Sequence, residues 1–146
     1  SIFSNYQKAP YFEQYHFLLE ELYLRSKWAL ISDLDTFAIK RIADILGIGV
    51  EWYRSSDLRC EGTKQGGKVV QICKKLKCDY FINGPASKDF MDEKLFSSED
   101  IILDYMKYSY DEYDQPYPPF NHYVSVLDVL FNCGANAKHH ILSSNL

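Results

Sequence analysis

The sequence lacks the patterns by which several large classes of protein are recognised. None of its apolar runs is long enough to cross a membrane, and no charged-then-apolar leader begins the chain. Neither of the glycine-rich nucleotide fingerprints, GxGxxG or GxxxxGK[ST], occurs. The formal net charge is −4, which argues against a nucleic-acid-binding surface. We therefore expect no membrane span and no nucleic-acid partner.

Metal-ligand spacing is missing as well. The four cysteines are irregularly spaced, and no histidine stands at the intervals that a zinc site needs: Cys60, Cys73, Cys78 and Cys133. We interpret them as reduced thiols of a cytoplasmic protein. The sequence implies no metal and no cofactor.

What the sequence does contain is an ordinary apolar content with many aromatic residues. Its 146 residues include 12 tyrosines and 9 phenylalanines, and 47% of all residues are hydrophobic. A chain of this length can bury a core of its own. We therefore predict one soluble globular domain that spans residues 1–146.

Hydrophobic periodicity alternates between the helical and the extended pattern along the chain. Helices are predicted from Ala9 to about Leu24, from Ser32 as N-cap to the stop at Gly47, from Lys64 to Lys77, and from Ala86 to about Phe96. Strands are predicted at Ile48–Arg54, Cys78–Asn83 and Ile101–Tyr108. This order favours an α/β fold, a small three-layer domain with a mostly parallel sheet covered by helices and Rossmann-like in arrangement.

The most apolar helix is predicted near the end of the chain, over Ser125–Cys133. Ser125 is suited to be its N-cap, and Asp128 three residues later completes a pair that resembles a capping box. Gly134 supplies the left-handed residue that commonly ends a helix. The residues between have almost no polar face, so this helix should be buried on nearly all sides.

Polar residues follow two of the predicted strands, and ligands of open parallel sheets bind at the carboxyl ends of strands. After one strand come Arg54, Ser55 and Ser56, and after another come the residues Asn83, Gly84, Pro85, Ala86, Ser87, Lys88 and Asp89. Gly84 would allow a ligand close to the backbone, Lys88 would neutralise a phosphate, and Asp89 would bind a sugar hydroxyl or act as a base. The alternative for both stretches is a tight strand-to-helix turn with a polar cap.

The residues around the last helix give weaker indications of chemistry. Cys133 lies at the helix C-terminus, where the dipole disfavours a thiolate, so we do not expect a nucleophile there. Phe120 and His122, just before the helix, are candidate substrate contacts. No Ser/His/Asp or Cys/His set can be assembled, and catalytic residues remain unassigned.

The stretch PFNHYVSVLDVLFNCG resembles the C-terminal signature of the WbqC-like proteins of bacteria, in which a Pro-Phe step precedes a run of the type Ser-Val-Leu-Asp-Leu-Leu-Phe-Asn-Cys-Gly. Other segments agree in order: Gln7–Tyr23, Ile42–Ile48, Arg54–Leu58 and Phe81–Phe96. The family's N-terminal signature, rich in Gln, Pro and aromatic residues, does not precede Ser1. We therefore expect this chain to be the C-terminal portion of a longer family member.

The resemblance implies a part in the biosynthesis of O-antigen and other surface polysaccharides. It implies a transferase that modifies an activated amino sugar, of an acyl or aminoacyl type, with a nucleotide-linked sugar or another small molecule as substrate. An alternative is a non-catalytic module that binds carbohydrate or a partner protein through Tyr117, Phe120 or Tyr123. A nucleotide-handling protein is a third hypothesis, which rests on the predicted parallel sheet alone.

Overall fold

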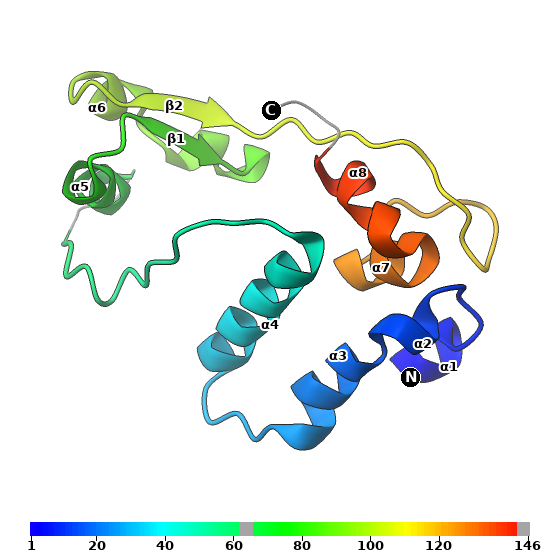
Figure 1. Ribbon diagram of the computed structural model, residues 1–146. Helices are drawn as coiled ribbons and strands as arrows, with labels where there is room; N and C mark the ends of the chain where they lie inside the picture. The colour runs from blue at the N-terminus through cyan, green and yellow to red at the C-terminus, as the bar shows by residue number, and fades with distance from the viewer. Residues whose placement is uncertain (62–65, 143–146) are drawn as a thin grey trace. The chain divides into compact units, whose positions relative to one another are not determined.

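The computed structural model describes residues 1–61 and 66–142, which fall into two compact units. The first unit combines residues 1–49 with the described part of 109–146, and the second unit is Val50–Tyr108. The first is helical, and the second contains a small sheet (Figure 1).

The first unit is built from short helices around one apolar core. Its elements are α1 (Ile2–Tyr6), α2 (Phe12–Tyr15), α3 (Phe17–Glu20), a π-helical turn (Glu21–Arg25), α4 (Ile31–Leu46), α7 (Val126–Cys133), a 3₁₀ turn (Gly134–Asn136) and α8 (Ala137–Leu142). The most deeply buried side chains are Phe12, Leu18, Leu130, Phe131 and Ala137. The Phe12 and Phe131 rings lie 5.1 Å apart between centroids, so the start of the chain packs on α7.

Helix α7 is buried as predicted, and one detail of its capping differs. The Ser125 hydroxyl accepts a hydrogen bond from the Leu127 backbone N–H at 3.2 Å, which confirms the N-cap. The capping-box role of Asp128 is wrong, because its carboxylate accepts hydrogen bonds from tyrosines elsewhere in the unit. Gly134 ends the helix at a positive φ of 57°, with ψ of −130° and therefore outside the left-handed helical region.

The N-terminal helices are more interrupted than their periodicity predicts. The single helix expected from Ala9 to Leu24 begins at Phe12, breaks at His16 and ends in the π-helical turn. Helix α4 begins at Ile31 without a side-chain cap, so the expected N-cap at Ser32 is wrong. Gly47 ends α4 in the left-handed conformation as predicted.

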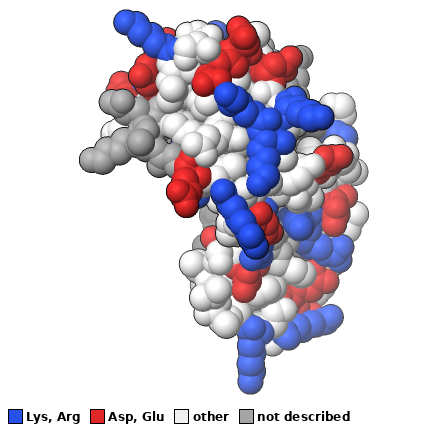
Figure 2. All heavy atoms as spheres, turned by 90° about the vertical axis from the view of Figure 1, so that its left-hand side faces the viewer, with Lys and Arg blue, Asp and Glu red and all other residues white. Residues whose placement is uncertain are grey.

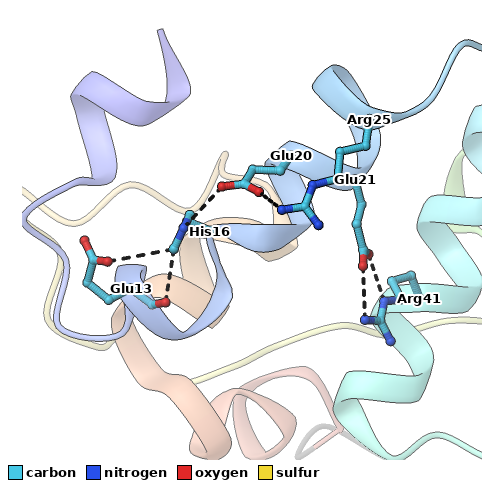
Figure 3. Close-up of polar contacts among 6 residues, drawn as sticks. All are labelled: Glu13, His16, Glu20, Glu21, Arg25 and Arg41. Atoms are coloured by element: carbon cyan, nitrogen blue, oxygen red, sulfur yellow. Dashed lines mark hydrogen bonds and ion pairs between the residues drawn. The ribbon is translucent and has the colours of Figure 1, made fainter.

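Charged side chains link these helices along the surface (Figure 3). Arg41 of α4 donates to both carboxylate oxygens of Glu21 at 3.0 and 3.3 Å, so α4 is fastened to the π-helical turn. His16 Nε2 lies 3.5 Å from Glu20 Oε1, and the other oxygen of Glu20 accepts from Arg25. His16 is therefore part of a surface network of charged side chains.

The second unit is organised around two parallel strands, β1 (Tyr80–Asn83) and β2 (Ile102–Tyr105), which lie side by side (Figure 1). It also contains α5 (Gly67–Leu76), a 3₁₀ helix (Pro85–Phe90) and α6 (Glu93–Ser97). Phe81 and Leu103 pack from the strands against a core made of Val70 and Cys73 from α5, Phe96 from α6, and Ile101, which directly precedes β2. The alternate residues of the strands point to the opposite face of the sheet and are more exposed: Tyr80 is 46%, Ile82 44% and Ile102 61% exposed.

The strand predicted at Ile48–Arg54 is wrong, because these residues have no regular secondary structure. Val50, Trp52 and Tyr53 are 52%, 43% and 55% exposed. Aromatic and β-branched residues form a strand only where a neighbouring strand or a packed face receives them. The described residues form a mixed α/β structure with a two-stranded parallel sheet. The three-layer Rossmann-like arrangement stays a prediction.

Candidate functional site

The carboxyl ends of β1 and β2 meet at one edge of the sheet, where the sequence predicted a site. Asn83 and Tyr105 are the last residues of the two strands, and they are register partners. Asn83 Oδ1 accepts from the Gly84 N–H at 2.9 Å, and the Ser87 hydroxyl donates to the Gly84 carbonyl at 2.6 Å. These bonds form the polar cap of a tight turn. Nothing lies within 4 Å of the position that a Cβ on Gly84 would take, so the backbone there is open to a ligand.

Lys88 and Tyr105 also line a pocket of about 520 Å³. The other lining residues come from α6, from β2 and from the segment between them: Glu93, Ser97, Asp100, Ile101, Ile102 and Leu103. The Lys88 Nζ lies 5.9 Å from the centroid of the Tyr105 ring. The Tyr105 hydroxyl is buried and has no hydrogen-bond partner among the described residues. Burial raises the pKa of Tyr105, and the nearby carboxylates Glu93 and Asp89 raise it further. The pocket wall therefore contains one cation, Lys88, and two carboxylates, Glu93 and Asp100, together with Tyr105.

Sequence reasoning selected Lys88 and Asp89 but missed Tyr105. The signal was present, because Tyr105 lies within the predicted strand Ile101–Tyr108 and the observed strand ends at this residue. Placing it required the register of the two strands, which pairs it with Asn83.

Arg54 and Ser55 lie in an exposed turn of the second unit. They were selected because they follow a predicted strand. Since that strand is absent, the argument that placed them at a sheet edge no longer holds. Their role as substrate contacts stays a prediction.

Phe120 and His122 lie in the first unit, in contact with one another. Their ring centroids are 4.8 Å apart, and both rings pack against Tyr110, whose hydroxyl donates to the His122 carbonyl at 3.0 Å. His122 Nε2 lies 3.8 Å from Glu112 Oε1. Phe120 also packs on Tyr113, with centroids 5.0 Å apart. The two residues thus form an aromatic cluster that orders the loop before α7.

Tyr113 joins this aromatic cluster to a buried carboxylate that sequence reasoning did not identify as a site. Its hydroxyl donates to Asp128 Oδ1 at 2.7 Å, and Tyr6 donates to Oδ2 at 2.8 Å. Gln115 Nε2 donates to Oδ1 at 3.0 Å. Burial raises the pKa values of both tyrosines, and their hydrogen bonds to Asp128 raise them further. Asp128 therefore connects α1, the loop and α7.

Cys133 is half-buried at the end of α7, and all four cysteines are free. Its pKa is raised first by burial and then by Asp128 and Asp114. A raised pKa keeps the thiol protonated, which agrees with the expectation that Cys133 is not a nucleophile.

The wider surface shows mixed charge. Basic and acidic side chains are interspersed over the face drawn in Figure 2. Within residues 1–61 and 66–142, no helix is both long enough and apolar enough to cross a membrane. In the same described residues, no group of three or more His, Cys, Asp and Glu side chains is placed to hold a metal ion.

Comparison with protein families places the chain in a class. The WbqC-like protein family model matches residues 1–140, and the chain belongs to this family. The resemblance seen in the stretch before Gly134 is thereby confirmed.

A curated relative extends the comparison. The chain is similar to "Uncharacterized protein Rv1507c" of Mycobacterium tuberculosis, with 28% identity over 138 residues. The aligned region covers 94% of this chain and 59% of the relative, so the chain spans about three fifths of the length of the curated relative it matches. No solved structure matches the chain.

Proposed function

We propose that the chain is part of a cytoplasmic transferase that modifies an activated amino sugar in bacterial surface polysaccharide (O-antigen) biosynthesis. The group transferred is of acyl or aminoacyl type. Membership of the WbqC-like family supports the polysaccharide context. In this proposal the chain forms a single α/β domain, and β1 and β2 belong to a larger, mostly parallel sheet covered by helices.

The observation that carries the proposal is the meeting of the two strand ends. Asn83 and Tyr105 are neighbours there, and Lys88 lies over the Tyr105 ring in the wall of a pocket of about 520 Å³. This volume is within the range of about 300–1,000 Å³ that small-molecule sites occupy. Ligands of parallel sheets bind at this edge.

Each side chain of the turn has a chemical role in the proposal. Lys88 neutralises a phosphate of a nucleotide-linked sugar, and the unpaired Tyr105 hydroxyl hydrogen-bonds to the same ligand. Asp89 accepts from a sugar hydroxyl, and Gly84 lets the ligand approach the backbone. Four further residues are proposed as substrate contacts: Arg54, Ser55, Phe120 and His122.

The test uses the full-length gene product that contains this chain and a panel of nucleotide sugars with acyl donors. Thermal shift identifies a ligand, and calorimetry then measures its affinity for the wild type and for Lys88→Ala and Tyr105→Phe. Each variant removes one strong hydrogen-bonding group, so we expect affinity to fall roughly tenfold or more. Tyr105→Phe should fold normally, because it removes only a hydroxyl that has no described partner.

Lys68→Ala is the matched control, since Lys68 is an exposed lysine on α5 of the same unit. It should bind as the wild type does. A full-length protein that binds no nucleotide sugar and transfers no group across the donor panel would refute the proposal.

The alternative function, a carbohydrate- or partner-binding module without catalysis, is favoured by one observation. Tyr117 and Tyr123 of the loop before α7 are 66% and 98% exposed, and exposed aromatic rings pack on sugars and protein interfaces. Under this alternative, Tyr117→Ala and Tyr123→Ala abolish binding while Lys88→Ala has no effect. The transferase proposal predicts the reverse.

A further inference from the structure

Asp128 is a buried negative charge whose described partners are all neutral. Asp128 lies in the first turn of α7 and is only 4% exposed. The hydrogen bonds come from the hydroxyls of Tyr6 and Tyr113 and from the amide of Gln115. Buried carboxylates are ordinarily paired with a cation, because hydrogen bonds alone replace only part of their hydration. The helix N-terminus contributes a partial positive charge, which is smaller than that of an ion pair.

A pocket of about 280 Å³ opens beside this carboxylate, and we call it the Asp128 pocket. Its lining residues are Asn5, Tyr6, Gln115, Pro116, Tyr117, Asn121, Val124 and Asp128. The volume of about 280 Å³ lies just below the range of about 300–1,000 Å³ for small-molecule sites, which suits a small ligand of monosaccharide size. Amide side chains suit hydroxyl groups of a ligand, and tyrosine rings attract cations.

The loop that forms one wall of the Asp128 pocket is fixed in advance. Gln115 Oε1 accepts from the Asn121 N–H at 2.8 Å, and Gln115 Nε2 donates to the Asn121 carbonyl at 3.1 Å. The same Nε2 donates to Asp128, so the loop and the carboxylate are held together. A wall ordered before binding reduces the entropy lost when a ligand enters.

We propose that the Asp128 pocket binds a small polyhydroxylated molecule through a primary ammonium group placed against Asp128 Oδ2. Oδ2 accepts one described hydrogen bond, from Tyr6, and has capacity for another. The ammonium group of the ligand supplies the counter-charge that the described partners of Asp128 lack. The ring hydroxyls of the ligand lie against the amide side chains of the pocket wall. This inference does not depend on the transferase proposal, whose pocket is lined by residues of the second unit.

The test compares three probes that share one ring and differ in one group. Glucosamine carries the ammonium, glucose has a hydroxyl in its place, and N-acetylglucosamine has a neutral amide. Each is titrated into the isotope-labelled protein while backbone and side-chain amide resonances are followed. We expect saturable shifts at Asn5, Gln115 and Asn121 with glucosamine, and at least roughly tenfold weaker binding of the two neutral sugars.

The Asp128→Asn variant keeps the side-chain shape and removes the charge, so the preference for glucosamine should disappear. A wild-type protein that binds the three sugars equally, or shows no shift with glucosamine at these residues, overturns the proposal without any variant. A folded Asp128→Asn protein that keeps the preference overturns it as well. Lys68→Ala changes an exposed residue of the second unit that has no proposed binding role, and it should leave glucosamine binding unchanged.

Discussion

The ring of Tyr11 lies against the backbone of Gly134, so close that a Cβ on residue 134 would be 2.5 Å from Tyr11 Cδ1. The Tyr11 N–H also donates to the Phe131 carbonyl at 2.9 Å. These two contacts fasten the N-terminal segment to the end of α7. They give Gly134 a packing role in addition to its role in ending the helix.

Gly134→Ala should therefore destabilise the protein strongly. The substitution adds a methyl group that overlaps the Tyr11 ring, at a residue whose φ of +57° side chains rarely adopt. Overpacking and the unfavourable φ together should lower the free energy of unfolding by about 2–5 kcal/mol. Urea denaturation measures the loss. Gly49→Ala is the control, because nothing lies within 4 Å of its Cβ position, and an equal loss in both variants would contradict the explanation.

The tyrosines bound to Asp128 should make stability fall in alkaline solution. The folded protein raises the pKa values of Tyr6 and Tyr113, so it binds their protons more tightly than the unfolded chain does. The resulting stabilisation is complete below the unfolded pKa of about 10 and is lost as pH rises above it. Each tyrosine should contribute a slope of up to about 1.4 kcal/mol per pH unit in that range.

Unfolding free energies of the wild type and the Tyr6→Phe/Tyr113→Phe double variant, measured from pH 8 to about pH 11, check this expectation. The unfolding free energy of the double variant should fall less steeply with rising pH than that of the wild type. Tyr123→Phe changes a residue that is 98% exposed and should keep the wild-type slope. Parallel curves for all three proteins would show that the Asp128 hydrogen bonds do not control the alkaline transition.

Two leucines on α7 provide a paired test of its burial. Leu130 is 0% exposed, while Leu127 is half-buried. Leu130→Ala should cost about 3–5 kcal/mol of unfolding free energy, and Leu127→Ala should cost clearly less, because it leaves a smaller cavity. Chemical denaturation of both variants gives the difference. If Leu127→Ala were the more costly of the two, the packing described for α7 would be wrong.

The ion pair between Glu21 and Arg41 should contribute little to stability. Both side chains are partly exposed, at 26% and 39%, so water screens the pair. Glu21→Gln should lower the free energy of unfolding by about 0.5–1 kcal/mol at low salt, and molar salt should abolish most of the loss. Glu13→Gln is the control, because the Glu13 side chain is 88% exposed and its ion-pair contact among the described residues is the long one to His16, at 3.9 Å. A loss that persists in molar salt would mean that Glu21 acts through packing.

The helices α4, α5 and α7, and the two short strands, were predictable because their signals are local. Ser125 caps α7, Gly47 ends α4, and the apolar run after Ser125 has no polar face to expose. The turn from Asn83 to Ser87 was predictable for the same reason, since a glycine and polar residues follow a strand. Neighbouring residues along the chain suffice to decide each of these features.

Tertiary structure alone decided the other features. Whether Ile48–Arg54 forms a strand depends on a partner, and none pairs with it among the described residues, so its β-rich composition did not settle its conformation. Asp128 could be interpreted from the sequence as a capping residue, because its true partners, Tyr6 and Tyr113, lie 122 and 15 residues away. Tyr105 became a site candidate only through its register with Asn83. A buried charge and a sheet edge are defined by residues distant in sequence, and only folding brings those residues together.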